Sequence, residues 1–348
     1  MNFQDKPPLR ATMNDVAAHA RVSIKSVSRV INNEPHVSPK LRLKVEAAIA
    51  ALDYVPDLAA RSLAGARSFE IGLLLGEMGP SYNSAVVTGV YRACIKHRYH
   101  LRLDTIPHEA RGNDALEHLE RILRGSRCDG FVVVPPYCDM PEVLDFFDAR
   151  RIPYSLISAS DDPSRTSDQA PGVRMDDTAA AADIADLFWR LGHRRIGLVG
   201  GRADHRSAVL RREGFLARLR SLDPALVVNE SEGGYLFDQG ITAGLELLSR
   251  PDRPTAIFAA NDDSAAGVIA ACNQLGLKVP GDISVCGFDD SWVAKSVWPH
   301  LTTVRQPVEA MAYAAANQLL ERGGGDSAPS VVTMPYELIE RGSTGAAP

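Results

Sequence analysis

Basic and hydrogen-bonding side chains gather on one face of a short helix that the sequence predicts over residues 24–31. Lys25 and Arg29 can each donate hydrogen bonds to O6 and N7 of guanine, and Ile24 can contact a thymine methyl group. The opposite face is apolar, because Val27 and its neighbours recur at helical spacing. This pattern is compatible with a helix that reads base edges in duplex DNA, and equally with a small helical bundle that carries ordinary solvated charges, so periodicity alone does not choose between them.

The distribution of charge supports the DNA interpretation. Residues 1–65 carry nine Lys or Arg and six Asp or Glu, so this segment is net +3 in a chain whose formal net charge is −5. The remainder of the chain is therefore net −8. A small basic head on a larger acidic body assigns phosphate binding to the head.

Two further short helices must hold the basic face in place. Thr12 and Asp15 form a capping pattern that begins the first helix, and Ser23 can cap the second. A third helix is expected from Ser38-Pro39, because proline is well placed at the first helical position. Two short helices joined by a tight turn and braced by a third form a helix-turn-helix, whose second helix enters the major groove.

The literal residues of this head strongly resemble those of the lactose-repressor (LacI/GalR) family. The matching stretches span residues 13–23, 26–32, 37–39 and 44–56. The resemblance implies that Ile24, Lys25 and Arg29 read base edges. It implies that a second group of side chains mainly holds the phosphates of the DNA backbone: Thr12, Ser23, Ser26, Asn32 and His36.

A hinge is expected over residues 57–66, between head and body. Asp57 can cap two helical turns and Gly65 can end them, but a helix this short is not stable alone. It would therefore fold only with DNA and a partner copy. The resemblance implies that paired hinge helices enter the minor groove and that Leu63 wedges between the central base pairs. The alternative is a plain linker in which Leu63 packs on the body.

Two positions depart from the family pattern. Arg21 stands where the family usually has glycine, and a residue other than glycine in a left-handed turn costs on the order of 1 kcal/mol. Its side chain either gains an extra phosphate contact or is merely tolerated. Asp57 stands where the family more often has asparagine, and it brings a negative charge towards DNA.

From Phe69 onwards, apolar runs alternate with helical stretches. The expected strands are 71–75, 101–106, 130–134, 154–157, 195–199, 256–259 and 283–286. The expected helices are 83–97, 114–124, 177–191, 207–220, 238–249, 263–275 and 307–321. Such repetition predicts parallel sheets covered on both faces. Seven units exceed one comfortable sheet, so two sheets with a cleft between them are expected.

Segments of the body resemble the LacI/GalR family as well, so that the resemblance covers nearly the whole chain. These segments are residues 176–201, 258–262, 281–290 and 301–307. The resemblance implies an α/β periplasmic-binding-protein-like body of two doubly wound parallel-sheet lobes that close on one ligand. The expected division is a head at 1–56, a hinge at 57–66, and a body at 67–348 with an N-lobe (about 67–168 and 306–330) and a C-lobe (about 169–305 and 331–348).

Ligands of open parallel sheets bind beyond the carboxyl ends of the strands, and candidate ligand residues fall there. By family position the strongest candidates for binding an effector are Ser207, Arg211, Asn261 and Asp289. Weaker candidates are Tyr82, Ser158 and Tyr235. Arg211 offers a fork of donors and Asp289 offers acceptors, which suits neighbouring sugar hydroxyls. The alternative for this pair is a salt-bridge network between the lobes.

The sequence thus predicts a DNA-binding repressor that a small effector, a neutral mono- or oligosaccharide, releases from its operator. The alternative within the same fold is a regulator that binds DNA together with a nucleobase or another small co-repressor. A homodimer is expected, because two heads must be spaced to read a pseudo-palindromic operator.

Other classes of protein fit less well. The five cysteines are odd in number and scattered, which suits reduced thiols in the cytoplasm. No apolar run reaches the length of a membrane helix, and no signal-peptide core follows the first residues. His97 and His100 lack further metal ligands, and Gly200-Gly201 gives no dinucleotide motif. No metal, cofactor, membrane partner or enzymatic activity is therefore expected.

Overall fold

A computed structural model of the chain describes residues 11–31, 36–54, 67–76, 78–107, 110–159, 170–322 and 330–348. The chain divides into two compact units, Met1–Phe69 and Glu70–Pro348, and each is described by itself. Within the described ranges no helix combines the length and the apolar character needed to cross a membrane.

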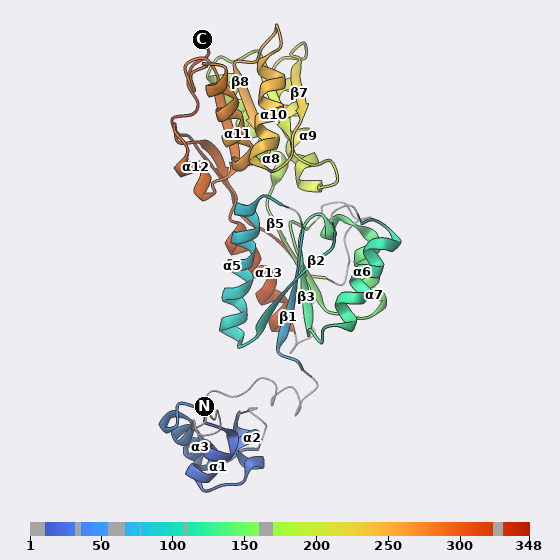
Figure 1. Ribbon diagram of the computed structural model, residues 1–348, viewed down its shortest axis with the longest axis vertical. Helices are drawn as coiled ribbons and strands as arrows, with labels where there is room; N and C mark the ends of the chain where they lie inside the picture. The colour runs from blue at the N-terminus through green and yellow to red at the C-terminus, as the bar shows by residue number, and fades with distance from the viewer. Residues whose placement is uncertain are drawn as a thin grey trace, which may run out of the picture. The chain divides into compact units, whose positions relative to one another are not determined.

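The first unit contains the three predicted helices: α1 (Met13–Ala20), α2 (Ile24–Ile31) and α3 (Pro39–Ala51) (Figure 1). α1 begins with a capping box, in which the Thr12 hydroxyl accepts from the Asp15 backbone N–H and the Asp15 carboxylate accepts from the Thr12 backbone N–H. Pro39 occupies the first turn of α3. One small apolar core joins the three helices: Val16, Ala17, Ala20, Val27, Val30, Val45, Ala48 and Tyr54.

The second unit contains two six-stranded sheets, each covered on both faces by helices (Figure 1). The first sheet has the order β11-β5-β4-β3-β1-β2, and all of its strands are parallel. Its strands are β1 (Glu70–Leu75), β2 (His100–Thr105), β3 (Gly130–Val133), β4 (Tyr154–Ile157), β5 (Gly172–Arg174) and β11 (Val331–Thr333).

The second sheet has the order β12-β10-β9-β8-β6-β7, and only β12 runs antiparallel to its neighbour. Its strands are β6 (Ile196–Gly200), β7 (Val228–Glu232), β8 (Ala256–Ala259), β9 (Ser284–Asp289), β10 (Thr302–Arg305) and β12 (Glu337–Ile339). The prediction of two parallel-sheet lobes is therefore confirmed.

Each sheet separates two apolar cores. In the first lobe α5 (Pro80–His97) and α13 (Val308–Arg322) cover one face, and α6 (Asn113–Arg124) and α7 (Pro141–Ala149) cover the other. In the second lobe α8 (Asp177–Arg190) and α9 (Arg206–Leu222) pack opposite α10 (Phe237–Leu248) and α11 (Asp262–Gln274). Two short helices complete the unit, a 3-10 turn at Tyr137–Asp139 and α12 (Trp292–Ser296).

The chain passes between the lobes three times: after β5, between β10 and α13, and between β11 and β12. β5 and β11 belong to the first sheet, so the chain changes lobe a few residues after the approximate boundaries at 168 and 330. Sequence reasoning missed five strands, because β5, β11 and β12 have only three residues each and β7 and β10 lack a long apolar run. It also missed α7 and α12.

Candidate functional site

The second helix of the head separates a buried face from a solvated face. Val27 and Val30 are buried against the other two helices, whereas Ile24 is 50% exposed and Lys25 is exposed. Arg29 is half-buried on the same helix. The helix therefore presents Ile24 and Lys25 outwards from an apolar core.

The residues at the ends of the helices are fixed by local hydrogen bonds. The Ser23 hydroxyl accepts from the Ser26 backbone N–H at 3.1 Å and lies 2.9 Å from the Ser26 hydroxyl, so Ser23 caps α2 as predicted. The Thr12 hydroxyl bonds to Asp15 at 2.7 Å. His36 is exposed, with a left-handed φ of 66°. Two predicted DNA contacts, Asn32 and Leu63, and the hinge at 57–66 lie outside the described residues.

Arg21 ends α1 in the left-handed conformation, with φ 49° and ψ 52°. The turn closes with two backbone bonds, from Arg21 N–H to the Ala18 carbonyl at 3.1 Å and from Val22 N–H to the Ala17 carbonyl at 3.0 Å. This is the conformation that glycine adopts most readily, so the expected left-handed turn is present and an exposed arginine occupies it.

In the second unit, the predicted effector residue Arg211 lies buried on α9. Its Nε donates to Asp177 at 2.7 Å, and its two terminal nitrogens donate to the Ala260 carbonyl and to Gln306, each at 3.0 Å. The guanidinium also lies 3.6 Å from the centre of the Phe288 ring. Each of the three guanidinium nitrogens thus has a hydrogen-bond partner within the protein.

Charge at this centre is balanced within the protein. Burial disfavours the charged form of Arg211, but the carboxylates of Asp177 and Asp289 raise its pKa above the usual value. Burial raises the pKa of Asp289 to about 7, although the Arg211 guanidinium opposes this shift. Asp289 also has a strained φ of 111° at the end of β9, and such strain is more frequent at functional sites. A buried arginine faces two carboxyls, one of which can gain or lose a proton near neutral pH.

Asn261 is held by structural bonds. Its side-chain oxygen accepts from the Ser264 backbone N–H at 2.9 Å and caps α11, and its amide nitrogen donates to the Tyr235 carbonyl at 3.0 Å. Both polar atoms of its side chain therefore already have partners within the protein. A polar residue just after a strand is equally typical of a helix cap, and the sequence did not separate the two roles.

The aromatic residues of the cleft are buried and incompletely bonded. The Tyr235 hydroxyl has no hydrogen-bond partner among the described residues, although the side chain is almost fully buried. Tyr82 is equally buried, but its hydroxyl lies within hydrogen-bonding reach of Ser158. Burial raises the pKa of both phenols, and the hydrogen bond with Ser158 opposes the shift at Tyr82. A buried hydroxyl without a partner loses its hydration uncompensated, so the Tyr235 hydroxyl is available to a ligand.

Sequence reasoning missed a third buried ring, His205. It lies 5.2 Å from the Tyr235 ring, and neither ring nitrogen has a hydrogen-bond partner among the described atoms. Burial lowers its pKa to about 4, while the nearby Asp204 carboxylate opposes the shift. The neutral imidazole offers one donor and one acceptor. Asp177 and Gln306, which hold Arg211, were also missed, because only the fold brings them to α9.

Two contacts join the lobes beside these residues. The Asp139 carboxylate of the first lobe accepts from the Arg206 backbone N–H of the second at 2.9 Å. Arg111 of the first lobe forms an ion pair with Asp204 of the second. The cleft is thus bridged by charged groups in the described conformation.

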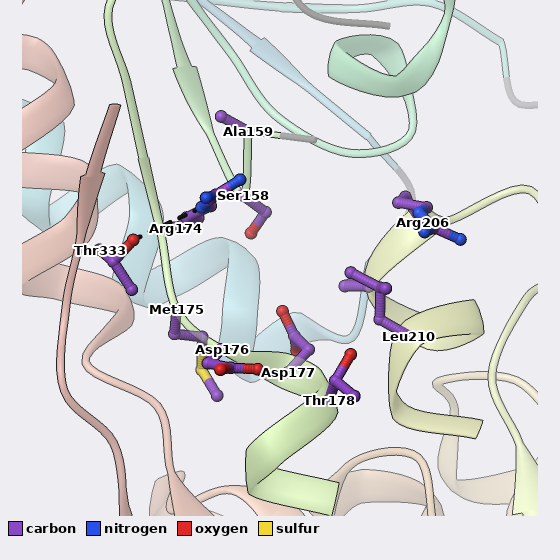
Figure 2. Close-up of a pocket in the computed structure, with 11 residues that line it drawn as sticks. Ser158, Ala159, Arg174, Met175, Asp176, Asp177, Thr178, Arg206, Leu210 and Thr333 are labelled. Carbon is purple, nitrogen blue, oxygen red and sulfur yellow. Dashed lines mark hydrogen bonds between the residues drawn. The ribbon is translucent and has the colours of Figure 1, made fainter. Parts of the chain in front are cut away.

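Two cavities are lined by residues to which Arg211 is hydrogen-bonded. The smaller has a volume of about 190 Å³, and Figure 2 shows Ser158 at the end of β4 facing Asp177 and Thr178 at the start of α8. Ser207 also lines this cavity. The larger has a volume of about 810 Å³, and its lining includes Tyr82, Asp289 and Gln306. Arg211 is bonded to Asp177 in the first lining and to Gln306 in the second, so it lies between the two groups of predicted ligand residues.

Comparison with known proteins connects both units to transcriptional regulators. Residues 12–57 match the description "Bacterial regulatory proteins, lacI family", and residues 185–344 match "Periplasmic binding protein-like domain". The ribose operon repressor of Escherichia coli (strain K12) is 35% identical over 320 residues, which cover 90% of this chain and 93% of that protein.

Solved structures agree over almost the whole chain. The complex of the transcriptional regulator CelR with cellobiose is 30% identical, with a TM-score of 0.69, and covers 96% of this chain and 100% of that one. The lac repressor dimer bound to operator and the anti-inducer ONPF is 27% identical, with a TM-score of 0.75, and covers 97% and 100%.

Proposed function

The chain belongs to the lacI family of bacterial regulatory proteins, and from that premise we propose that it is a transcriptional repressor released from its operator by a neutral sugar. The regulators that it resembles are not described as enzymes, and we assign it no catalytic step. Because operator DNA lies in the bacterial cytoplasm, we place its action there.

The observation that carries the sugar proposal is the combination of balanced charge and unpartnered polar atoms in the cleft. Arg211 is neutralised by Asp177 at 2.7 Å, so a charged ligand would unbalance the buried centre. The Tyr235 hydroxyl and the His205 imidazole have no hydrogen-bond partner among the described residues. A ligand with many neutral hydroxyls meets both conditions. The CelR complex with cellobiose supports the same class of ligand.

In the head, we propose that α2 enters the major groove. Lys25, Arg29 and Ile24 then contact base edges, and the remaining predicted DNA residues contact the backbone: Thr12, Ser23, Ser26, Asn32 and His36. For the hinge at 57–66 we propose that Leu63 wedges into the minor groove. The sequence resemblance supports these roles.

We propose a homodimer, and exposed apolar side chains support it. Tyr91 and Ile95 on α5 and Leu103 on the edge strand β2 are each more than half exposed. In the other lobe, Trp292 and Trp298 are 70% and 80% exposed. Large exposed apolar residues on a protein of this size mark interaction surfaces. Light scattering at micromolar concentration should therefore give the mass of a dimer.

Release requires that the sugar bind one lobe arrangement more tightly than the other, since equal affinity shifts no equilibrium. By linkage, operator DNA must then weaken sugar binding by the same factor. The test is calorimetry with neutral mono- and disaccharides, sugar phosphates and nucleobases, each with and without an operator selected from a randomised pool. Heat from a neutral sugar that operator DNA diminishes is the expected result.

Binding of a nucleobase that strengthens operator binding would instead establish the co-repressor alternative. The control is the variant Lys25→Ala together with Arg29→Ala. It should lose about 1–3 kcal/mol of base discrimination at each contacted pair while sugar heats stay unchanged. Unchanged operator preference in that variant would contradict the assignment of α2.

A further inference from the structure

The parallel strands β1, β2, β3 and β4 of the first sheet begin at the same end of that sheet. In the parallel register Glu70 pairs with His100, Ile71 with Gly130, and Phe131 with Tyr154. The segments that precede these strands therefore lie along the same edge of the sheet. We call this surface the basal face and define it as residues 67–70, 96–100, 121–129 and 148–153. It is also where the chain coming from the head enters the second unit.

The basal face is basic in an acidic chain. Its segments contain eight Lys or Arg and three Asp or Glu, whereas the whole chain is net −5. Some of these cations are neutralised, since Arg150 pairs with Glu120 and Lys96 lies 3.6 Å from Glu321. Others are exposed and form no ion pair with any described carboxylate: Arg98, Arg124, Arg127 and Arg151.

Two of these arginines occupy left-handed positions at helix ends. Arg98 after α5 has φ 59° and Arg151 after α7 has φ 55°. Both turns close with the same pair of backbone bonds. Arg98 donates to Ile95 at 3.1 Å and the next residue donates to Cys94 at 2.8 Å, while Arg151 and its successor donate to Asp148 and Phe147, each at 3.0 Å. This is the helix-ending motif in which glycine is the favoured residue.

The second lobe ends two helices with the same motif, and glycine stands there. Gly192 after α8 has φ 89° and Gly276 after α11 has φ 70°. Their closing bonds have the same pattern, from Gly192 to Trp189 at 3.0 Å and from Gly276 to Asn273 at 3.1 Å. The same left-handed conformation at a helix end is thus occupied by glycine in the second lobe. In the first lobe an exposed arginine occupies it, at a cost in backbone strain.

Charge alone does not explain the difference. The second lobe also carries cations at its corresponding end, for example Arg253 and Lys278, which precede β8 and β9. What distinguishes the basal face is the replacement of glycine by arginine and the attachment of the head. The 15 residues from 55 to 69 can span at most about 50 Å, so the DNA just outside the operator is within reach.

We propose that the basal face binds the phosphate backbone of the DNA that flanks the operator. The inference rests on the proposed function as a DNA-binding repressor and adds a second, sequence-independent contact to the head. Arginines without an ion pair to a described carboxylate are suited to it, because phosphate oxygens accept hydrogen bonds from the guanidinium and each neutralised phosphate releases condensed counterions. Arg98 and Arg151 contribute charge where a glycine would have sufficed for the fold.

The test compares Arg98→Gly and Arg151→Gly, alone and together, with the wild-type protein. Glycine suits both left-handed positions, so these variants should fold with equal or greater thermal stability. The probes are two duplexes that share an operator selected from a randomised pool, a short form that ends at the operator and a long form with flanking DNA on both sides. Binding is measured by fluorescence anisotropy over a series of salt concentrations.

The wild-type protein should bind the long form more tightly and with a steeper salt dependence than the short form. Each lost phosphate contact should reduce the slope of log K against log salt by about 0.9 on the long form only. The matched control, Arg253→Gln with Lys278→Gln, removes two cations from the second lobe and should change neither form.

Three outcomes would overturn the proposal. The double variant could keep the wild-type preference for the long duplex, it could lose affinity equally for both duplexes, or the control variant could lose affinity for the long duplex to the same extent. Failure of the wild-type protein to bind either duplex is a different result, and it would contradict the proposed function itself.

Discussion

The two halves of the cleft differ in how completely their polar groups are bonded. In the ionic half, around Arg211, every branch of the guanidinium has a partner at 2.7–3.0 Å. In the aromatic half, around Tyr82, Tyr235 and His205, the Tyr235 hydroxyl and the imidazole have none among the described residues. The polar groups of the ionic half are therefore satisfied within the protein, and we expect a ligand to supply the partners that the aromatic half lacks. Such a division allows a ligand to contribute binding energy chiefly to one arrangement of the lobes.

The largest effect is expected from Arg211→Ala. Removing the arginine leaves Asp177 buried without its partner, which should lower the free energy of unfolding by about 3–5 kcal/mol and abolish sugar binding. Adding Asp177→Asn should restore part of that stability but none of the sugar binding. Urea denaturation and calorimetry measure the two quantities. If Arg211→Ala lost no more stability than the replacement of an exposed arginine, the bonds between Arg211 and its partners would not stabilise the folded protein.

The pH dependence of stability should separate the two halves by sign. Asp289 holds a proton in the folded protein between pH 3.8 and about 7 that the unfolded chain has lost, so it makes the free energy of unfolding fall as pH rises through that window. His205 lacks a proton in the folded protein between about 4 and 6.5 that the unfolded chain holds, so it makes stability rise with pH there.

The variants Asp289→Asn and His205→Gln each remove one of the two titrating groups. The pH dependence of the free energy of unfolding that remains should then come from the other group. In denaturation at a series of pH values between 4 and 6.5, stability should rise more steeply with pH in Asp289→Asn than in the wild-type protein. In His205→Gln it should rise less steeply or fall. Identical slopes in all three proteins would refute the assignment of a buried proton to the ionic half and of a neutral imidazole to the aromatic half.

A smaller effect is expected from Tyr235→Phe. The hydroxyl has no partner without ligand, so its removal should leave stability unchanged or slightly higher, while sugar affinity falls by about 0.5–1.5 kcal/mol. The matched control is Tyr137→Phe, because the buried Tyr137 hydroxyl donates to the Ile106 carbonyl. The control should lose stability and keep its sugar affinity. Equal stability losses in both variants would place Tyr235 among the structural residues.

The sequence allowed the head and most helices to be predicted, because their signals are local. Thr12 with Asp15, Ser23 and Pro39 each mark a helix start within a few residues, and all three helices begin there. The expected strands of the sheet centres are present for a similar reason, since a buried parallel strand is an apolar run. β7, with the sequence Val-Asn-Glu-Ser-Glu at a sheet edge, carries no such signal.

The composition of the cleft was only partly predictable. Arg211 and Asp289 could be named from their positions in the sequence, but the partner of Arg211 could not, because Asp177 lies 34 residues away on another helix. Asn261 looked like a ligand residue and is bonded as a helix cap. His205 gave no sign of burial, since only the packing of Tyr235 and the two lobes removes it from water. Long-range contacts, rather than local pattern, decide these roles.

The three passages of the chain between the lobes also govern the order in which the protein can fold during synthesis. α13 covers one face of the first sheet with Met311, Ala312, Ala315 and Ala316, all fully buried, yet it follows the greater part of the second lobe in the sequence. At ribosomal rates, the stretch from residue 175 to residue 322 takes about 7 to 30 s to make. Throughout that time the first lobe must expose the apolar face that α13 will cover, whereas the head is complete from the start. The nascent chain is thus a finished DNA-binding module followed by an unfinished lobe, and we expect chaperones to bind it at that uncovered sheet.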